Sequence, residues 1–257
     1  MFKTRLISGI VLLAGLITLI IIGGLPLWIA SLIVACLGIY ELYKVCGIHN
    51  DRITWVSYPV TAAYFLFVSR FKNAAAIIMG IVIIILTIYV IAFPRIRFSK
   101  YKVIPLAVLY PGLLSGALYL TRSSISGLYF ASIILITSWG SDTAAYCTGM
   151  LIGKTHPFPQ LSPKKTIAGC IGGVIGGSLL CAVLALIMKE SVIAAISIGI
   201  VGSVFSEIGD LCASAFKRQY DVKDYGSLIP GHGGIMDRFD SMMFTGAIVF
   251  ICVTFLY

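Results

Sequence analysis

Long apolar segments, separated by short polar ones, follow each other along almost the whole chain. The hydrocarbon core of a bilayer is about 30 Å thick, and a helix needs roughly 20 apolar residues to cross it. The segments have about this length, so the pattern predicts an all-α integral membrane protein with about nine transmembrane helices. The first segment lacks the cleavage site of a secretory signal and is expected to stay as a span. The predicted helices cover residues 6–22, 25–40, 54–69, 74–93, 103–120, 127–148, 167–188, 191–212 and 241–257.

The composition excludes an ordinary soluble domain. Of the 257 residues, 59% are hydrophobic and only 11% are charged, whereas about 25% charged residues are typical of soluble proteins. No internal repeat or polar linker divides the sequence, so we expect a single polytopic membrane domain over residues 1–257. Polar residues gather late in the chain. Residues 1–130 are therefore expected to form scaffold and lipid-facing helices, and residues 131–257 the catalytic helices and cytoplasmic loops.

Membrane topology explains the positive charge of the chain. The net charge is +9, but the basic residues occupy short loops, which argues against nucleic-acid binding. Lysine and arginine are enriched on the cytoplasmic side of membrane spans. With the N-terminus inside, 15 of the 19 basic residues become cytoplasmic, which predicts an N-in/C-out protein of the cell (inner) membrane. Both long polar loops, residues 149–166 and 213–240, then face the cytoplasm. The four exceptions are Arg70, Lys72, Arg122 and Lys189.

A polar stripe follows the eighth predicted helix. Glu207, Asp210, Ser214 and Lys217 are spaced at i, i+3, i+7 and i+10, so they share one face of the helix. Carboxylates within membrane spans are unfavourable and usually mark a functional site. The stripe predicts that two carboxylates, a hydroxyl and an ammonium face one cleft. The alternative is a ladder of salt bridges within this helix.

A glycine-rich turn precedes the ninth predicted helix. Its residues His232, Gly233 and Gly234 allow close approach of backbone N–H groups, and the following helix N-terminus favours anions, which predicts a phosphate cradle. Asp237 and Asp240 lie at i and i+3 in the first turn of that helix. Carboxylate oxygens of this kind suit Mg²⁺, which also takes phosphate oxygens and water. The alternative is a simple capped turn.

A third group of polar residues flanks the loop at 149–166. Asp142 lies near the end of the sixth predicted helix, and Lys164, Lys165 and Thr166 open the seventh. Adjacent lysines beside a hydroxyl at a helix N-terminus suit a triphosphate or a lipid phosphate. The alternative for the lysines is anchoring at the cytoplasmic face. The seventh helix also carries glycines every four residues, from position 169 to 177, which predict close helix packing.

The segment from Ser214 to Asp240 closely resembles the signature of the phosphatidate cytidylyltransferase family. The resemblance rests on the run Ser214, Lys217, Arg218, Lys223, Asp224, Gly226, Pro230, His232, Gly233, Gly234, Asp237, Arg238 and Asp240. The blocks from Asp142 to Tyr146 and from Ser162 to Thr166 also look like those of the family. Two positions depart from the pattern, since Ala168 and Ala213 stand where the family often has an acidic residue.

The resemblance implies transfer of a cytidylyl group from CTP to phosphatidate, which gives CDP-diacylglycerol and pyrophosphate and depends on Mg²⁺. It implies that Asp210, Asp237 and Asp240 bind the metal, and that Lys217 and Arg218 take part in catalysis. A second, monovalent cation is left open. The expected nucleotide and phosphate contacts are Asp142, Lys164, Lys165, Thr166, Ser214, Asp224, His232, Gly233, Gly234 and Arg238.

Three other functions are compatible with intramembrane carboxylates. An ion-coupled carrier is the first, although it would be expected to have broken helices in paired halves. A CDP-alcohol phosphotransferase is the second, but its Asp-Gly-x-x-Ala-Arg pattern is missing from the sequence. A CTP-using lipid kinase is the third. The expected partners are CTP, phosphatidate and membrane lipids, and the sequence leaves a homodimer open.

Overall fold

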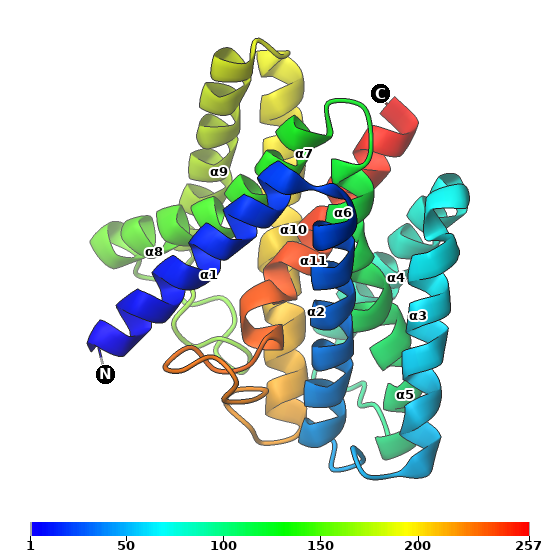
Figure 1. The fold of residues 1–257 in the computed structure, drawn as a ribbon. Coiled ribbons are helices and arrows are strands. Elements are labelled where there is room, and N and C mark those ends of the chain that lie inside the picture. The colour runs from blue at the N-terminus through cyan, green and yellow to red at the C-terminus, as the bar shows by residue number, and fades with distance from the viewer. Residues whose placement is uncertain (1, 257) are drawn as a thin grey trace.

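A computed structural model describes residues 2–256, with side chains from residue 6 onward, and the fold within that range is helical (Figure 1). The β-structure of the described residues is a single isolated bridge between Ile229 and Gly233. The all-α prediction is therefore confirmed. The side chains of Lys3 and Arg5, which contribute to the topology prediction, lie outside the described residues.

The N-terminal half begins with two long helices that meet at a tight turn, followed by the short α3 and the long α4. It contains α1 (Phe2–Ile22), α2 (Gly24–Val45), α3 (Ser57–Phe67), α4 (Lys72–Ala92), α5 (Val103–Ala107) and α6 (Gly116–Arg122), with a π-helical segment η4 (Val108–Leu113) between the last two. The C-terminal half contains α7 (Gly127–Leu135), the π-helical segment η5 (Ile136–Gly140), α8 (Ser141–Ile152), α9 (Ile167–Met188), α10 (Val192–Gln219) and α11 (Met236–Leu256).

Six helical segments within the described residues are long and apolar enough to cross a membrane. They are Gly24–Val45, Lys72–Ala92, Lys100–Arg122, Ile167–Met188, Val192–Gln219 and Met236–Leu256. The prediction of nine spans is not confirmed, because the other three predicted segments are not among these six. Helix α1 is 21 residues long, but its side chains are described only from Leu6, and the apolar part Leu6–Ile22 is therefore not among the six, so the first predicted span stays a prediction. Residues 54–69 yield only the 11 residues of α3, and residues 127–148 are divided between α7, η5 and α8.

Helix α10 is at the centre of the molecule and packs against both α9 and α11 (Figure 1). An aromatic cluster fills the space between α4, η4, α10 and α11. The ring of Phe216 lies 4.8 Å from that of Tyr89 and 6.3 Å from that of Tyr110, and Tyr110 meets Phe244 at 5.7 Å. Burying large rings together stabilises the bundle around the end of α10.

The predicted glycine packing is present between α8 and α9. A Cβ atom on Gly173 would lie 3.0 Å from the Cβ of Ala145 in α8. This is tighter than an ordinary van der Waals contact, so glycine is needed for the two helices to lie this close. The contact brings the N-terminal end of α9, with the lysines that precede it, next to Asp142.

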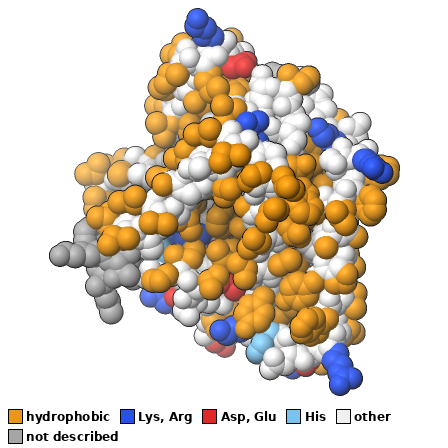
Figure 2. Space-filling model, in the orientation of Figure 1, with side chains coloured by type: hydrophobic (Ala, Val, Ile, Leu, Met, Phe, Trp, Pro, Cys, Tyr) orange, Lys and Arg blue, Asp and Glu red, His pale blue; other side chains and the backbone are white. Residues whose placement is uncertain are grey.

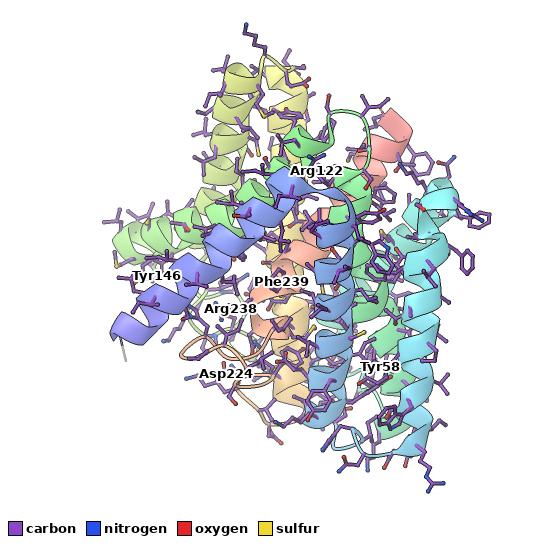
Figure 3. All side chains as sticks on the ribbon, viewed as in Figure 1. Tyr58, Arg122, Tyr146, Asp224, Arg238 and Phe239 are labelled. Carbon is purple, nitrogen blue, oxygen red and sulfur yellow. The ribbon has the colours of Figure 1, made fainter. Side chains whose placement is uncertain are left out.

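The polar loops gather at one end of the bundle. The connections from α8 to α9 and from α10 to α11 both lie at the lower end in Figure 1, while the C-terminus and the turn from α9 to α10 lie at the upper end. Arg122, one of the four basic residues excluded from the cytoplasmic set, is also at the upper end (Figure 3). Hydrophobic side chains cover most of the visible face between the two ends (Figure 2). The arrangement agrees with the predicted grouping of the loops on one side of a membrane.

Candidate active site

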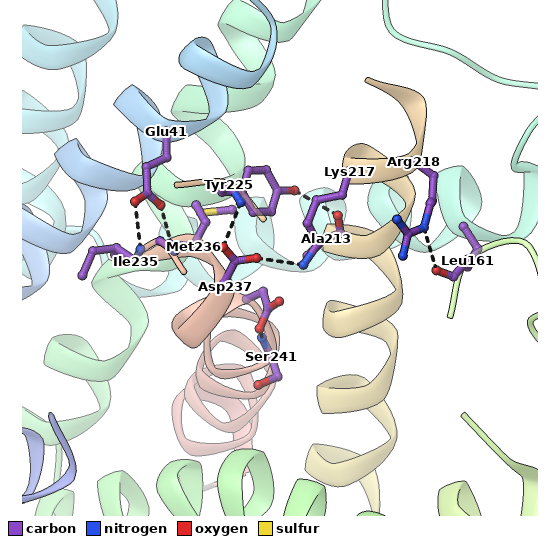
Figure 4. A network of polar contacts seen from close by, with 12 residues as sticks. Glu41, Leu161, Ala213, Lys217, Arg218, Tyr225, Ile235, Met236, Asp237 and Ser241 are labelled. Atoms are coloured by element: carbon purple, nitrogen blue, oxygen red, sulfur yellow. Dashed lines mark hydrogen bonds and ion pairs between the residues drawn. The ribbon is translucent and has the colours of Figure 1, made fainter. Parts of the chain in front are cut away.

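The carboxylate of Asp237 joins three segments at the start of α11. Its Oδ1 accepts a hydrogen bond from Lys217 Nζ at 2.8 Å, and its Oδ2 accepts from the backbone N–H groups of Tyr225 at 2.8 Å and Gly234 at 3.0 Å (Figure 4). The Asp237 side chain is only 2% exposed. Since both oxygens have partners, Asp237 fixes the glycine-rich turn against the ends of α10 and α11.

A second buried carboxylate, from the N-terminal half, holds the same turn. Glu41 in α2 accepts hydrogen bonds from the backbone N–H groups of Ile235 at 2.9 Å and Met236 at 2.8 Å (Figure 4). These are otherwise unsatisfied donors at a helix N-terminus, which a negative charge stabilises. Gly234 packs directly against the Glu41 carboxylate and leaves no room for a Cβ atom. Glu41 is absent from the residues predicted above, although a lone carboxylate at the end of an apolar segment is a signal of a functional site.

Lys165 and Asp210 form an ion pair between the loop before α9 and the middle of α10. Their Nζ and Oδ2 atoms are 3.0 Å apart, and Lys165 also donates to the carbonyl oxygen of Glu207 at 3.3 Å. Burial alone would lower the pKa of the Lys165 ammonium, but the carboxylates of Asp210 and Glu207 outweigh burial and hold this pKa above its ordinary value. Lys165 is therefore a fixed cation at neutral pH.

A cavity of about 470 Å³ opens beside this ion pair. We call it the phosphate cavity. Its lining includes Asp142, Ser162, Lys164, Lys165, Thr166, Glu207 and Asp210. The structure thus brings together the predicted residues from the two ends of the 149–166 loop with Asp210 of the stripe. Beside the three carboxylates of this lining, the two lysines and the N-terminus of α9 are groups that favour an anionic ligand.

Asp240 lies deeper, in the second turn of α11. Its side chain is buried, and its Oδ1 accepts a hydrogen bond from the Ser241 backbone N–H at 2.7 Å. The charges of Asp210, Lys217 and Asp142 are close enough to act on it. Asp240 therefore lies between the phosphate cavity and the Lys217–Asp237 pair.

The predicted metal ligands do not form one compact set. In the part of the chain that the structure describes, no three His, Cys, Asp or Glu side chains lie close enough to hold one ion. Asp237 is occupied by Lys217 and two backbone donors, whereas Asp210 lies at the phosphate cavity. The binding of a metal by Asp210, Asp237 and Asp240 stays a prediction.

The alternative prediction, a ladder of salt bridges within α10, is wrong for the described residues. Both ion pairs found among the described residues join α10 to other segments, Lys165 to Asp210 and Lys217 to Asp237. Of the stripe residues, Glu207 and Asp210 line the phosphate cavity, whereas Ser214 and Lys217 do not, so one cleft shared by all four stays a prediction. Ser214, the hydroxyl of the stripe, is buried.

The remaining predicted residues are distributed around these two groups. Thr166 is the N-cap of α9 and its Oγ1 accepts from Gly169 N at 3.1 Å. Arg218 donates to the carbonyl oxygen of Leu161 at 3.4 Å, which ties α10 to the loop before α9. Asp224 is exposed, and Gly233 has a φ of +87°, a value that glycine adopts without strain.

His232 and Arg238 face α1 and not the phosphate cavity. His232 Nδ1 lies 2.8 Å from Ser8 Oγ in α1. The Nε of Arg238 is buried and has no hydrogen-bond partner. The predicted anion-binding residues therefore divide into two sets, one around Lys165 and one beside α1.

Comparison with known proteins gives one consistent result. A model of the cytidylyltransferase family matches residues 3–256. The phosphatidate cytidylyltransferase of Bacillus subtilis (strain 168) is 29% identical over 256 residues, which cover 94% of either chain. That of Staphylococcus saprophyticus is 32% identical and that of Staphylococcus aureus (strain COL) is also 32% identical, each over 94% of this chain and 95% of the relative.

Proposed function

The chain belongs to the cytidylyltransferase family, and we propose that it transfers the cytidylyl group of CTP to phosphatidate, with CDP-diacylglycerol and pyrophosphate as products. The relatives that carry this activity in their names align with the chain over nearly its full length. The structural observation that carries the proposal is the phosphate cavity, in which Lys164 and Lys165 lie at the N-terminus of α9 at the polar end of a membrane bundle. Family membership favours this enzyme over an ion-coupled carrier.

The reaction needs positioning and charge neutralisation more than a strong base. The phosphate of the lipid is already an anionic nucleophile at neutral pH. One of its oxygens forms a bond to the α-phosphorus of CTP, the bond between this phosphorus and the oxygen that bridges it to the β-phosphorus breaks, and pyrophosphate leaves with the electron pair. Fixed cations such as Lys165 lower the repulsion between the two anions and stabilise the charge that develops on the leaving group.

We further propose that Mg²⁺ is the cofactor. Oxygen donors fit the ion, because Asp210 and Asp142 face the phosphate cavity and Asp240 acts electrostatically on both. Asp237, also predicted as a ligand, has three hydrogen-bond donors in this structure and suits a positioning role. When bound, the metal would neutralise phosphate oxygens. The second, monovalent cation and the homodimer remain predictions.

The membrane orientation is also proposed. With the N-terminus inside the cell, the phosphate cavity would face the cytoplasm, where CTP is available, and the protein would belong to the inner membrane. The two long polar loops lie at the same end, as this orientation requires (Figure 1), and the excess of basic residues on their side favours the cytoplasm.

Two forms of labelled CTP test the proposal against the lipid-kinase alternative. Purified protein is incubated with phosphatidate, Mg²⁺ and CTP labelled either at the α- or at the γ-phosphate. A cytidylyltransferase puts only the α-label into the lipid phase and releases the γ-label as pyrophosphate. Transfer of γ-label to a lipid would indicate a kinase, and absence of label from the lipid in both reactions would contradict the proposal.

A further inference from the structure

Helix α1 forms one wall of a cavity on the other side of Asp142. The cavity measures about 520 Å³, and we call it the α1 groove. Its apolar part is lined by Leu12 and Leu13 of α1 and by Leu135, Ile136 and Trp139 of the facing α7–η5 segment. Its polar end is lined by Asp142, His232 and Arg238. The α1 groove is thus amphiphilic, with charge at one end and an apolar wall beyond it.

Contacts between distant segments build the polar end. Ser8 of α1 donates a hydrogen bond to the carbonyl oxygen of Pro230 at 3.0 Å and lies beside the imidazole of His232. Trp139 Nε1 donates to the carbonyl oxygen of Arg238 at 3.3 Å. These contacts fix the glycine-rich turn and the first turn of α11 against both walls of the groove.

One nitrogen of the guanidinium at this end lacks a hydrogen-bond partner. Arg238 Nε is buried without a hydrogen-bond partner, and leaving such a donor unsatisfied is unfavourable. Asp142 lines the same end, and Arg238 is close enough to offset its charge. A phosphate would satisfy the guanidinium, since arginine binds phosphate through charge-assisted hydrogen bonds.

From this geometry we propose that the α1 groove binds the lipid substrate, with its phosphate at Arg238 and His232 and one acyl chain along the wall formed by Leu12, Ile136 and Trp139. The proposal rests on the proposed function, which supplies the lipid phosphate as a reactant. Asp142 lines both the α1 groove and the phosphate cavity. The lipid would therefore approach the nucleotide across Asp142, with each substrate in its own cavity.

Two other apolar cavities fit a lipid phosphate less well. One, between α9 and α10, is lined by Ile171, Ile175 and Glu207, and its charged residue is a carboxylate with a buried, unpartnered Oε1. Such a group repels a phosphate. The other, between α1, α2 and α11, has no charged residue among its described lining residues. The α1 groove alone among these three combines a cation with an apolar wall.

Tryptophan substitutions test the acyl-chain part of the proposal. Leu13→Trp should raise the KM for dioleoyl phosphatidate about tenfold, since filling an apolar pocket changes discrimination by about 10- to 200-fold, and should leave the KM for dihexanoyl phosphatidate and for CTP within about twofold. Ile10→Trp is the matched control, because Ile10 is exposed on the same helix and lines none of these cavities. Ile175→Trp tests the cavity between α9 and α10.

The possible outcomes distinguish a failure of the lipid-binding proposal from a failure of the proposed function. The proposal is overturned if Leu13→Trp behaves like Ile10→Trp with both lipids, or if Ile175→Trp alone gives the chain-length-selective effect. An inactive wild-type protein would instead overturn the proposed function on which the groove depends.

A second experiment uses the unaltered protein, in case Leu13→Trp does not fold. Phosphatidate with a photoreactive diazirine in one acyl chain is crosslinked to the wild-type enzyme, and the labelled peptides are sequenced. Label within residues 8–22 or 135–143 is expected. Label confined to α9 and α10 would contradict the proposal.

Discussion

Lys217 Nζ and Asp237 Oδ1 lie 2.8 Å apart, and this ion pair joins the end of α10 to the first turn of α11. The two side chains are 13% and 2% exposed, so water screens the pair very little. The same Asp237 carboxylate holds two backbone N–H groups around the glycine-rich turn. The position of the turn beside the two cavities therefore depends on this pair.

Removing one partner of this pair should be strongly destabilising. Lys217→Met leaves the Asp237 charge buried without its cation, and breaking such a pair typically lowers stability by about 3–5 kcal/mol. We expect a lower melting temperature in detergent and a loss of turnover. The double variant Lys217→Met/Asp237→Asn should be less destabilised than the single variant, because no buried charge is left alone.

The matched control for this pair is Lys223→Met. Lys223 is exposed in the same loop region, so its replacement should change the melting temperature little. If Lys217→Met melts like the control and keeps wild-type turnover, the ion pair does not have the role assigned to it.

Glu41 should affect activity although it lies in the N-terminal half. Glu41→Gln replaces one of the two acceptor oxygens by an N–H₂ group that faces a backbone donor, and an unsatisfied buried donor is unfavourable by about 1–3 kcal/mol. We expect reduced stability together with a lower kcat, because Glu41 holds the start of α11, which carries Asp237 and Arg238. Glu190→Gln, in the turn between α9 and α10, is the control. Equal behaviour of the two variants in melting and turnover would refute the role of Glu41.

Lys165 should contribute mainly to nucleotide binding. Lys165→Met removes a fixed cation from the phosphate cavity, and a hydrogen bond to a charged group contributes about 1.5–3 kcal/mol. The KM for CTP should rise about tenfold or more. Lys154→Met serves as the comparison, since Lys154 is exposed in the same loop and does not line the phosphate cavity. An unchanged KM for CTP in Lys165→Met would show that the nucleotide binds elsewhere.

Metal removal should stop the reaction reversibly. Chelation with EDTA is expected to abolish turnover, and Mg²⁺ should restore it, because oxygen ligands and phosphate together suit this ion. Asp210→Asn should require a higher Mg²⁺ concentration for half-maximal turnover than the wild type. Full turnover in excess EDTA would contradict the assignment of Mg²⁺.

Hydropathy predicted the fold class and six of the spans, but it could not count the helices. Residues 54–69 are apolar enough for a span, yet only 11 of them form α3. A hydropathy average depends on composition alone and does not show where a helix begins and ends. The glycine spacing in α9, in contrast, did predict its close packing against α8.

The site was predicted where its residues lie close in sequence or share a helix face. Lys164, Lys165 and Thr166 do line a cavity with Asp142 and Asp210. The distance in sequence between Lys217 and Asp237 could not predict their ion pair, because the loop between them has no regular secondary structure that would fix their relative positions. It also could not reveal the contact between Glu41 and Met236, which are 195 residues apart. The tertiary fold alone brings these partners together.

The most direct test of the account is the turnover of Asp240→Asn, measured as transfer of label from α-labelled CTP into phosphatidate. Asparagine keeps the size of the side chain and removes the carboxyl group, on which the charges of Asp210, Lys217 and Asp142 act. We expect a folded membrane protein that melts like the exposed-site control Asp221→Asn. Its turnover should fall by roughly 10²- to 10³-fold, the usual effect of losing one electrostatic contribution to a transition state. Near wild-type turnover with unchanged Mg²⁺ dependence would contradict the placing of the reaction at these carboxylates.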